Sequence, residues 1–157
     1  MKRIVIFYSY GGNTRRVAEK VARAIGADLA EIETVEPYSR SYDAVVDQGQ
    51  REVNSGFLPE LCPLNVDLSG YDAIILGTPV WWYTFAPAMN SFLHGADLSG
   101  KTVYPFATNG GWIGHTFRDF GKACPGAAVR PGLNIRFQED RQITPDAEIL
   151  KWARGIS

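Results

Sequence analysis

The sequence contains little cysteine, and its two cysteines lie far apart. Cys62 and Cys124 form no CxxC motif, so the chain lacks the spacing of a disulfide framework or of a zinc site. We therefore expect two structural cysteines, no bound metal ion, and a reducing compartment, the cytoplasm.

An excess of charge of one sign and a long hydrophobic run are also missing. The formal net charge is −1, which gives no electrostatic reason to bind nucleic acid or an anionic membrane. The first apolar run, IVIFY at residues 4–8, leads directly into a polar segment with two glycines. It is too short for a secretory signal, and no segment approaches the length that spans a bilayer. The sequence predicts neither a nucleic-acid partner nor a membrane partner.

Length and composition are typical of one globular domain over residues 1–157. A content of 45% hydrophobic and 21% charged residues is ordinary for such a domain. A chain of this length buries about two-thirds of the surface that its unfolded form exposes. Residues 36–66 are the least regular part and contain Pro59 and Pro63, so we expect a surface excursion there and not a second domain.

Five segments have the character of strands. The clearest begins the stretch YDAIILGTPVWWY at residues 71–83, whose apolar start is too short and too rich in β-branched residues for a helix. Such a run is typical of a parallel strand that is covered on both faces. The other expected strands span residues 4–8, 28–35, 101–108 and 129–137, the last interrupted by Pro131-Gly132.

Helical periodicity alternates with these strands. In residues 15–25, Val17, Val21 and Ile25 form one apolar stripe. Asn13 or Thr14 is the expected cap at the start of this helix. Gly26 stands where a helix ends in the left-handed conformation.

Four further helices are expected along the chain. They span residues 43–54, with Val46, Gly49 and Val53 inward, residues 86–94, with Pro87 in the first turn, and two later segments. Of the two later segments, the earlier carries Phe117, Phe120 and Cys124 on one face. The later one follows the helix-start signal Thr144-Pro145-Asp146. The alternation predicts an α/β fold in three layers, with a doubly wound, five-stranded parallel sheet.

Three of the expected strands end in unusual loops, at residues 9–14, 78–83 and 108–114. The carboxyl ends of parallel strands lie at one edge of the sheet, so these loops should converge. In open α/β sheets the ligand binds beyond this edge. The convergence predicts a ligand site built from all three loops.

The first loop suits a phosphate group. Its glycines allow successive backbone N–H groups to turn inward, Ser9 and Thr14 add hydroxyl groups, and a helix begins there. The sequence has no GxxxxGK[ST] and no GxGxxG motif, which argues against a nucleoside triphosphate and a dinucleotide. A monophosphate fits best; the alternative is a plain strand-to-helix turn. Arg15 and Arg16 either assist the phosphate or are solvated.

The other two loops suit a flat ligand. Trp81, Trp82 and Tyr83 cannot all face the core of a loop, so at least one should be exposed or stacked, although core packing or a subunit interface is the alternative. Gly110 and Gly111 let the backbone of the third loop approach a planar ring. His115 follows this loop and is either a proton donor near the ring or an ordinary surface histidine. No residue is identified as catalytic.

These three segments, YSYGGNT at residues 8–14, YDAIILGTPVWW, and residues 108–114, resemble the three flavin mononucleotide (FMN) loops of flavodoxins and flavodoxin-like proteins. The Trp-Trp pair resembles one branch of that family. The resemblance implies one flavodoxin-like domain with strand order 2-1-3-4-5 and bound FMN. It assigns the phosphate to Ser9, Gly11, Gly12, Asn13 and Thr14. It assigns the ring to Thr78, Pro79, Val80, Trp81, Trp82, Tyr83, Thr108, Asn109, Gly110 and Gly111, with Trp112 beside them.

The resemblance implies a redox protein that transfers electrons through non-covalently bound FMN. Its partner would be a redox protein or a small acceptor such as a quinone, and the chain would be a monomer or a homodimer. One alternative is an NAD(P)H-dependent quinone or flavin reductase on the same fold. The other is a flavin-free signalling or interaction domain, although a phospho-receiver needs acidic residues where Ser9-Tyr10 and Thr78-Pro79 stand.

Overall fold

Three buried apolar runs form the centre of the sheet in the computed structural model, which describes residues 2–157. They are β1 (Arg3–Phe7), β3 (Ala73–Trp81) and β5 (Thr102–Asn109). β3 pairs in parallel with β1 from Arg3↔Ala73 to Phe7↔Gly77, and with β5 as far as Pro79↔Thr108. Because helices cover both faces, these strands carry apolar side chains on both sides.

The full sheet has the predicted order. β2 (Asp28–Glu31) lies beside β1 and β7 (Leu133–Gln138) beside β5, which gives β2-β1-β3-β5-β7 for the five longer strands. This confirms the doubly wound sheet and its order 2-1-3-4-5. Three two-residue strands, which the sequence did not predict separately, are β4 (Thr84–Phe85), β6 (Ala128–Val129) and β8 (Arg141–Gln142). β6 and β7 are the expected last strand, divided around Pro131-Gly132.

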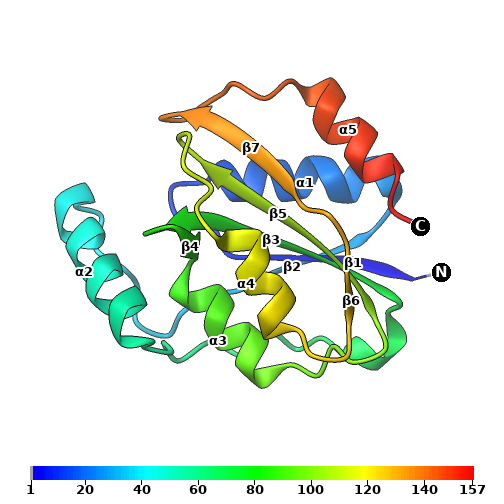
Figure 1. The fold of residues 1–157 in the computed structure, drawn as a ribbon, viewed down its shortest axis with the longest axis horizontal. Coiled ribbons are helices and arrows are strands. Elements are labelled where there is room, and N and C mark those ends of the chain that lie inside the picture. Colours follow the sequence, from blue (N-terminus) through cyan, green and yellow to red (C-terminus); the bar gives the residue numbers. More distant parts are fainter. Residues whose placement is uncertain (1) are drawn as a thin grey trace.

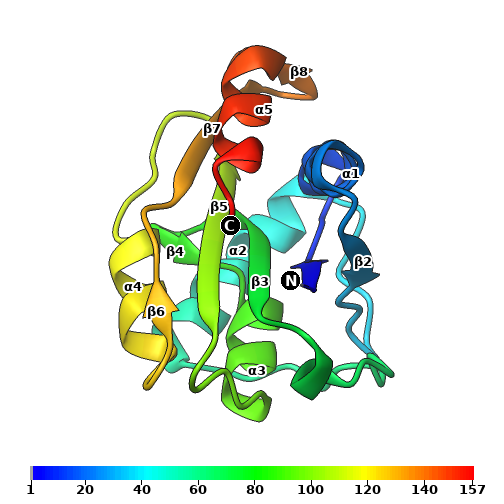
Figure 2. The ribbon, with the colours of Figure 1, turned by 90° about the vertical axis from the view of Figure 1, so that its right-hand side faces the viewer.

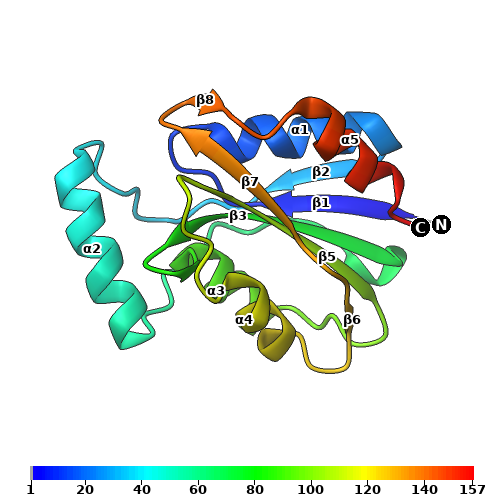
Figure 3. The ribbon, with the colours of Figure 1, turned by 45° about the horizontal axis from the view of Figure 1, so that its top comes forward.

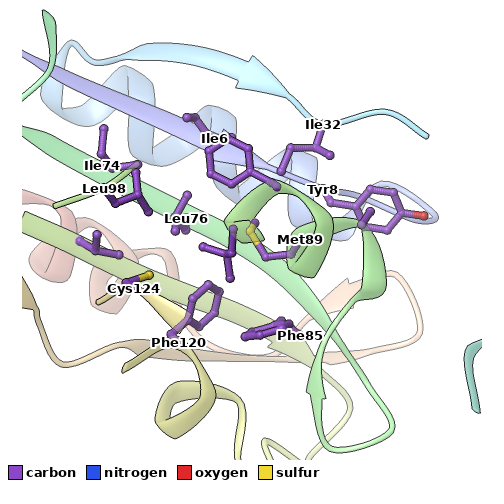
Figure 4. Close-up of a cluster of buried hydrophobic side chains, with 14 of the residues drawn as sticks. Ile6, Tyr8, Ile32, Ile74, Leu76, Phe85, Met89, Leu98, Phe120 and Cys124 are labelled. Atoms are coloured by element: carbon purple, nitrogen blue, oxygen red, sulfur yellow. The ribbon is translucent and has the colours of Figure 1, made fainter. Parts of the chain in front are cut away.

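Two helices cover each face of the sheet (Figures 1 and 2). α1 (Asn13–Ile25) and α5 (Asp146–Arg154) lie on one face, and α3 (Pro87–Gly95) and α4 (Thr116–Ala123) lie on the other. A hydrophobic core lies on each face of the sheet, and alternate residues of β1 pack into one core or the other. Val5 and Phe7 pack with α1 and α5, whereas Ile6 packs with α3 and α4. Figure 4 shows the core on the α3 and α4 face, which extends to Tyr8 at the carboxyl edge of the sheet.

Helix α2 (Tyr42–Ser55) lies apart from these layers, beyond the carboxyl edge of the sheet (Figures 1 and 3). It belongs to the excursion expected over residues 36–66 and ends at Gly56 in the left-handed conformation. Of the three residues predicted to face inward, Gly49 is buried, whereas Val46 and Val53 are only partly buried. The buried positions are Val45, Gly49 and Glu52, because the buried face includes a carboxylate that accepts hydrogen bonds from Tyr38 and Gln48.

Two predicted helix caps were wrong. α1 is capped by Gly12, at φ 98°, without a side-chain hydrogen bond. The side chain of Asn13 donates to the carbonyl of Glu139 instead. α5 is preceded by Pro145, and the hydroxyl of Thr144 accepts from the N–H of Arg136 at 2.8 Å. In each case a contact distant in sequence replaces the local cap.

A membrane span is not among the helices of residues 2–157, none of which has the length and apolar character that one requires.

The end of β3 is sensitive to added volume. A Cβ at Gly77 would lie 2.2 Å from Cζ of Phe106, a fully buried ring of β5. Gly77→Ala is therefore expected to lower the free energy of unfolding by about 1–3 kcal/mol, measured by urea denaturation. Gly70→Ala is the control, because a Cβ there meets nothing within 4 Å. Equal effects of the two substitutions would contradict this account of the strand packing.

Candidate functional site

The first loop presents a row of unpaired backbone donors. Gly11 and Gly12 are both left-handed, at φ 81° and 98°, immediately before α1. Within the described part of the chain, no backbone N–H from Ser9 to Thr14 has a protein acceptor. A Cβ at Gly11 would meet nothing within 4 Å, so the loop is open. Unpaired amides at a helix N-terminus form an anion-binding site.

The side chains of the first loop are mostly engaged within the protein. Ser9 Oγ accepts from the N–H of Arg15 at 3.2 Å. The hydroxyl groups of Thr14 and Thr108 pair at 2.8 Å and are buried, which joins the first loop directly to the third. The backbone therefore offers more free donors to an anion than the side chains do.

The two arginines that follow differ in position. Arg15 forms an ion pair with Glu31, and the hydrogen bond that its guanidinium donates to this carboxylate raises the pKa of Arg15. Arg16 hydrogen-bonds to Asn13 and lies against the loop, since a Cβ at Gly12 would be 3.1 Å from its Nη1. Arg16 is thus the cation closest to the open amides of this loop.

The second loop is a tight hairpin, which the sequence analysis did not predict. β3 pairs with β4 through Val80↔Phe85 and Trp81↔Thr84, so Trp82 and Tyr83 form the two-residue turn. Their φ angles are 51° and 72°, as a type I′ turn requires. Such turns normally carry Asn-Gly, and a bulky residue in this conformation costs about 1–3 kcal/mol. The usual sequence signal for a hairpin is therefore absent.

Contacts from other elements hold this turn in place. Trp82 Nε1 donates to the carbonyl of Val46 in α2 at 3.0 Å, and the N–H of His115 donates to the carbonyl of Tyr83 at 2.8 Å. His115 also pairs with Asp119, whose carboxylate accepts from the hydroxyl of Thr84 at 2.5 Å. His115 thus supports the hairpin, and it does not line the hollows beside it.

The three adjacent aromatics have different environments. Trp81 packs edge-to-face against Tyr8, Tyr10 and Tyr38, with ring centroids 5.0–6.0 Å apart. Trp82 lies against α2, while Tyr83 is 53% exposed. The expectation that at least one of the three is exposed is confirmed.

Two phenols beneath this cluster remain protonated. Burial raises the pKa of Tyr8. Burial, and then the hydrogen bond to Glu52, raises the pKa of Tyr38. Trp81 therefore packs against two neutral phenol rings, and the hydroxyl of Tyr38 donates to the Glu52 carboxylate.

Two hollows flank the hairpin. The first, the loop hollow, lies between the second and third loops and has a volume of about 240 Å³. Its lining is Val80, Trp82, Tyr83, Asn109, Gly110 and Trp112. The second, the α2 cavity, lies between the hairpin and α2 and measures about 340 Å³. Trp112 is 76% exposed at the rim of the loop hollow.

Not every predicted site residue points toward these hollows. Thr78 is fully buried, and its hydroxyl accepts from the N–H of Ala86 at 3.0 Å, so it supports the base of the hairpin. Asn109 does line the loop hollow, but its side-chain amide is already hydrogen-bonded to Asn134 and to the N–H of Gly111. The sequence analysis missed Tyr38 and the α2 positions. The only signal for the α2 positions was the predicted inward face of that helix, of which Val46 and Gly49 line the α2 cavity.

The cysteines lie apart from this edge. Cys124 is buried in the core beside α4, and burial raises the pKa of its thiol to about 11. Its thiol is therefore protonated at neutral pH and unreactive. Cys62 is exposed and free.

Comparisons with known proteins give one consistent family. A family model described as Flavodoxin matches residues 2–152. A candidate flavoprotein of Bacteroides eggerthii is 29% identical, with a TM-score of 0.83 over 99% of this chain and 97% of its own. A flavoprotein of Lactobacillus acidophilus, solved in complex with FMN, is 24% identical, with a TM-score of 0.79 over 97% and 98% of the two chains. Among curated proteins, no significant match was found.

The strain in the turn can be measured. Tyr83→Gly removes the cost of the left-handed backbone, whereas Tyr83→Ala removes only the side chain, which is 53% exposed. The glycine variant should be more stable than the alanine variant by about 1 kcal/mol in urea denaturation.

A matched pair at Tyr42 should give the opposite order. Tyr42 is the first residue of α2, and in a helix alanine is favoured over glycine by up to about 1 kcal/mol. If alanine were also the more stable variant at Tyr83, the turn would not be strained.

Proposed function

The chain belongs to the flavodoxin family, and from this premise we propose that it binds FMN non-covalently and transfers electrons through it. The observation that carries the proposal is the pair of unpaired amides at Gly11 and Gly12, in a loop that the Thr14–Thr108 hydrogen bond joins to the third loop and its aromatic-walled hollow. The L. acidophilus relative, whose structure is described in complex with FMN, supports the same cofactor.

The first loop fits a phosphomonoester. The amides of residues 9–14 are free to donate to phosphate oxygens, and the N-terminus of α1 adds its positive dipole. Arg16 lies next to Gly12 and provides the nearest positive charge. In this proposal the phosphate contacts of Ser9, Gly11, Gly12, Asn13 and Thr14 are made chiefly by backbone N–H groups.

The loop hollow fits a planar ring system. Trp82, Tyr83 and Trp112 supply aromatic walls, and Gly110 has no side chain to obstruct a flat ligand. Val80 contributes an apolar side chain and excludes water from one side. The residues assigned to the ring, Thr78 to Tyr83 and Thr108 to Gly111, divide into those that face the hollow and those, such as Thr78, that hold its walls.

FMN, when bound, supplies the chemistry, because it accepts and donates one or two electrons, while the protein binds and orients it. Tyr83 and Trp112 are exposed at the rim, which supports access by an electron partner, either a redox protein or a small acceptor. The free cysteines, with Cys62 exposed, support the cytoplasm as the place of action.

The phosphate site is tested by introducing a negative charge into the first loop. Asp and Asn both tolerate the left-handed conformation of Gly11, but only Asp brings a negative charge to the amides. Gly11→Asp should weaken FMN binding at least tenfold, whereas Gly11→Asn should stay within a few-fold of the natural protein. Flavin fluorescence titration measures both.

Riboflavin, which has no phosphate, is the control ligand. Its affinity should be the same for both variants and lower than that of FMN for the natural protein. If FMN does not bind the natural protein at all, the proposed function is wrong. If riboflavin binds as tightly as FMN, the first loop is not a phosphate site.

Mixing the FMN-loaded protein with NADPH or NADH distinguishes an electron carrier from a reductase. We propose the carrier, since no catalytic group lines the loop hollow. FMN-loaded protein mixed anaerobically with NADPH, and separately with NADH, should keep its visible flavin band until a separate reductase is added. Rapid bleaching by either nucleotide alone would favour the NAD(P)H-dependent reductase instead.

A further inference from the structure

The α2 cavity is a second hollow, formed where α2 faces the first and second loops. Its walls include Tyr10, Tyr42, Val46, Gly49, Trp81 and Trp82, and its volume of about 340 Å³ exceeds that of the loop hollow. This volume falls in the range of small-molecule sites, which begins at about 300 Å³. The two hollows share only Val80 and Trp82.

The position of α2 keeps this cavity open. α2 approaches the hairpin most closely at Gly49, where a Cβ would be 3.3 Å from Cε3 of Trp81 and 3.6 Å from Cδ1 of Trp82. Hydrogen bonds from Trp82 Nε1 to Val46 and from Tyr38 to Glu52, at 3.0 and 2.5 Å, hold the helix there. The helix is therefore held close to the hairpin, and the cavity lies between the two.

The lining determines what the cavity can bind. No charged side chain lines it, and the indole N–H of Trp82 is already paired with a backbone carbonyl. A charged ligand would lose its hydration without gaining a partner. Tyr10, Trp81, Trp82 and Tyr42 are aromatic, so a flat molecule gains the largest contact area and ring stacking. These properties select a neutral, planar aromatic ligand.

We propose that the α2 cavity binds a neutral planar aromatic molecule of about two fused rings, such as a quinone. Binding itself depends only on the cavity. The further statement that this molecule lies beside the flavin, separated from it by Val80 and Trp82, rests on the proposed function. A small electron partner would thus have a site separate from the loop hollow, with Tyr10 of the first loop in its wall.

Isothermal titration calorimetry with 1,4-naphthoquinone tests the proposal on the full chain, with and without saturating FMN. One molecule should bind per chain, with an affinity that FMN changes less than threefold. The sulfonate of the same quinone carries a negative charge and should bind at least tenfold more weakly. Absence of binding, or an equal affinity for the sulfonate, would overturn the proposal.

Variants on α2 locate the site. Val46→Phe fills the cavity and should weaken quinone binding at least tenfold. Gln50→Phe adds the same ring at an exposed position of α2 outside the lining and should leave the affinity unchanged. Tyr42→Ala, at a position 75% exposed at the mouth, should weaken binding without disturbing the core. Equal affinities for all three variants would place the ligand elsewhere.

The titrations with and without FMN distinguish a failure of this inference from a failure of the proposed function. If saturating FMN abolishes quinone binding, the cavity is the seat of the flavin ring itself and the inference is wrong, although FMN binding stands. If the quinone binds but FMN does not, the proposed function is wrong and the cavity remains a ligand site. If FMN binds and the quinone does not, only the inference is overturned.

Discussion

Parallel pairing of β3 with both β1 and β5 is the constraint on which the rest of the structure depends. It brings the ends of three strands to one edge, so that residues near positions 10, 80 and 110 become neighbours. The strands pack closely, because the ring of Phe106 occupies the space that a side chain at Gly77 would need. The buried pair of Thr14 and Thr108 then joins the outer two loops across the edge.

The turn of the hairpin formed by β3 and β4 has the least favourable backbone conformation at this edge. Contacts from neighbouring elements hold it in place. Trp82 and Tyr83 adopt backbone conformations that aromatic residues avoid. Three contacts oppose this cost: Trp82 with Val46, Tyr83 with His115, and Thr84 with Asp119. Strained residues held in this way are common at ligand sites. Here the strain places an indole between two hollows of different chemistry.

The edge is divided into a polar first loop and two hollows with aromatic walls. The first loop, with its free amides and nearby Arg16, is suited to an anion, and the loop hollow extends the site toward a flat ring. On the other side of Trp82, α2 closes a cavity without charged lining. In our proposals, a cofactor with a phosphate and a neutral aromatic partner would bind at separate places on this edge, and Trp82 would line both.

The sequence by itself determined the order of strands and helices, the sheet, and the three loops that meet at its edge. Buried runs, helical stripes and glycines are local patterns, and parallel pairing follows from them. Only the tertiary structure decided the caps at Gly12 and Pro145, the hairpin at Trp82-Tyr83, and the burial of Val45 and Glu52. Each goes with a contact outside the local helix or turn: Asn13 with Glu139, Thr144 with Arg136, Tyr83 with His115, and Glu52 with Tyr38. Local propensity cannot specify such contacts, because they exist only once the layers have packed.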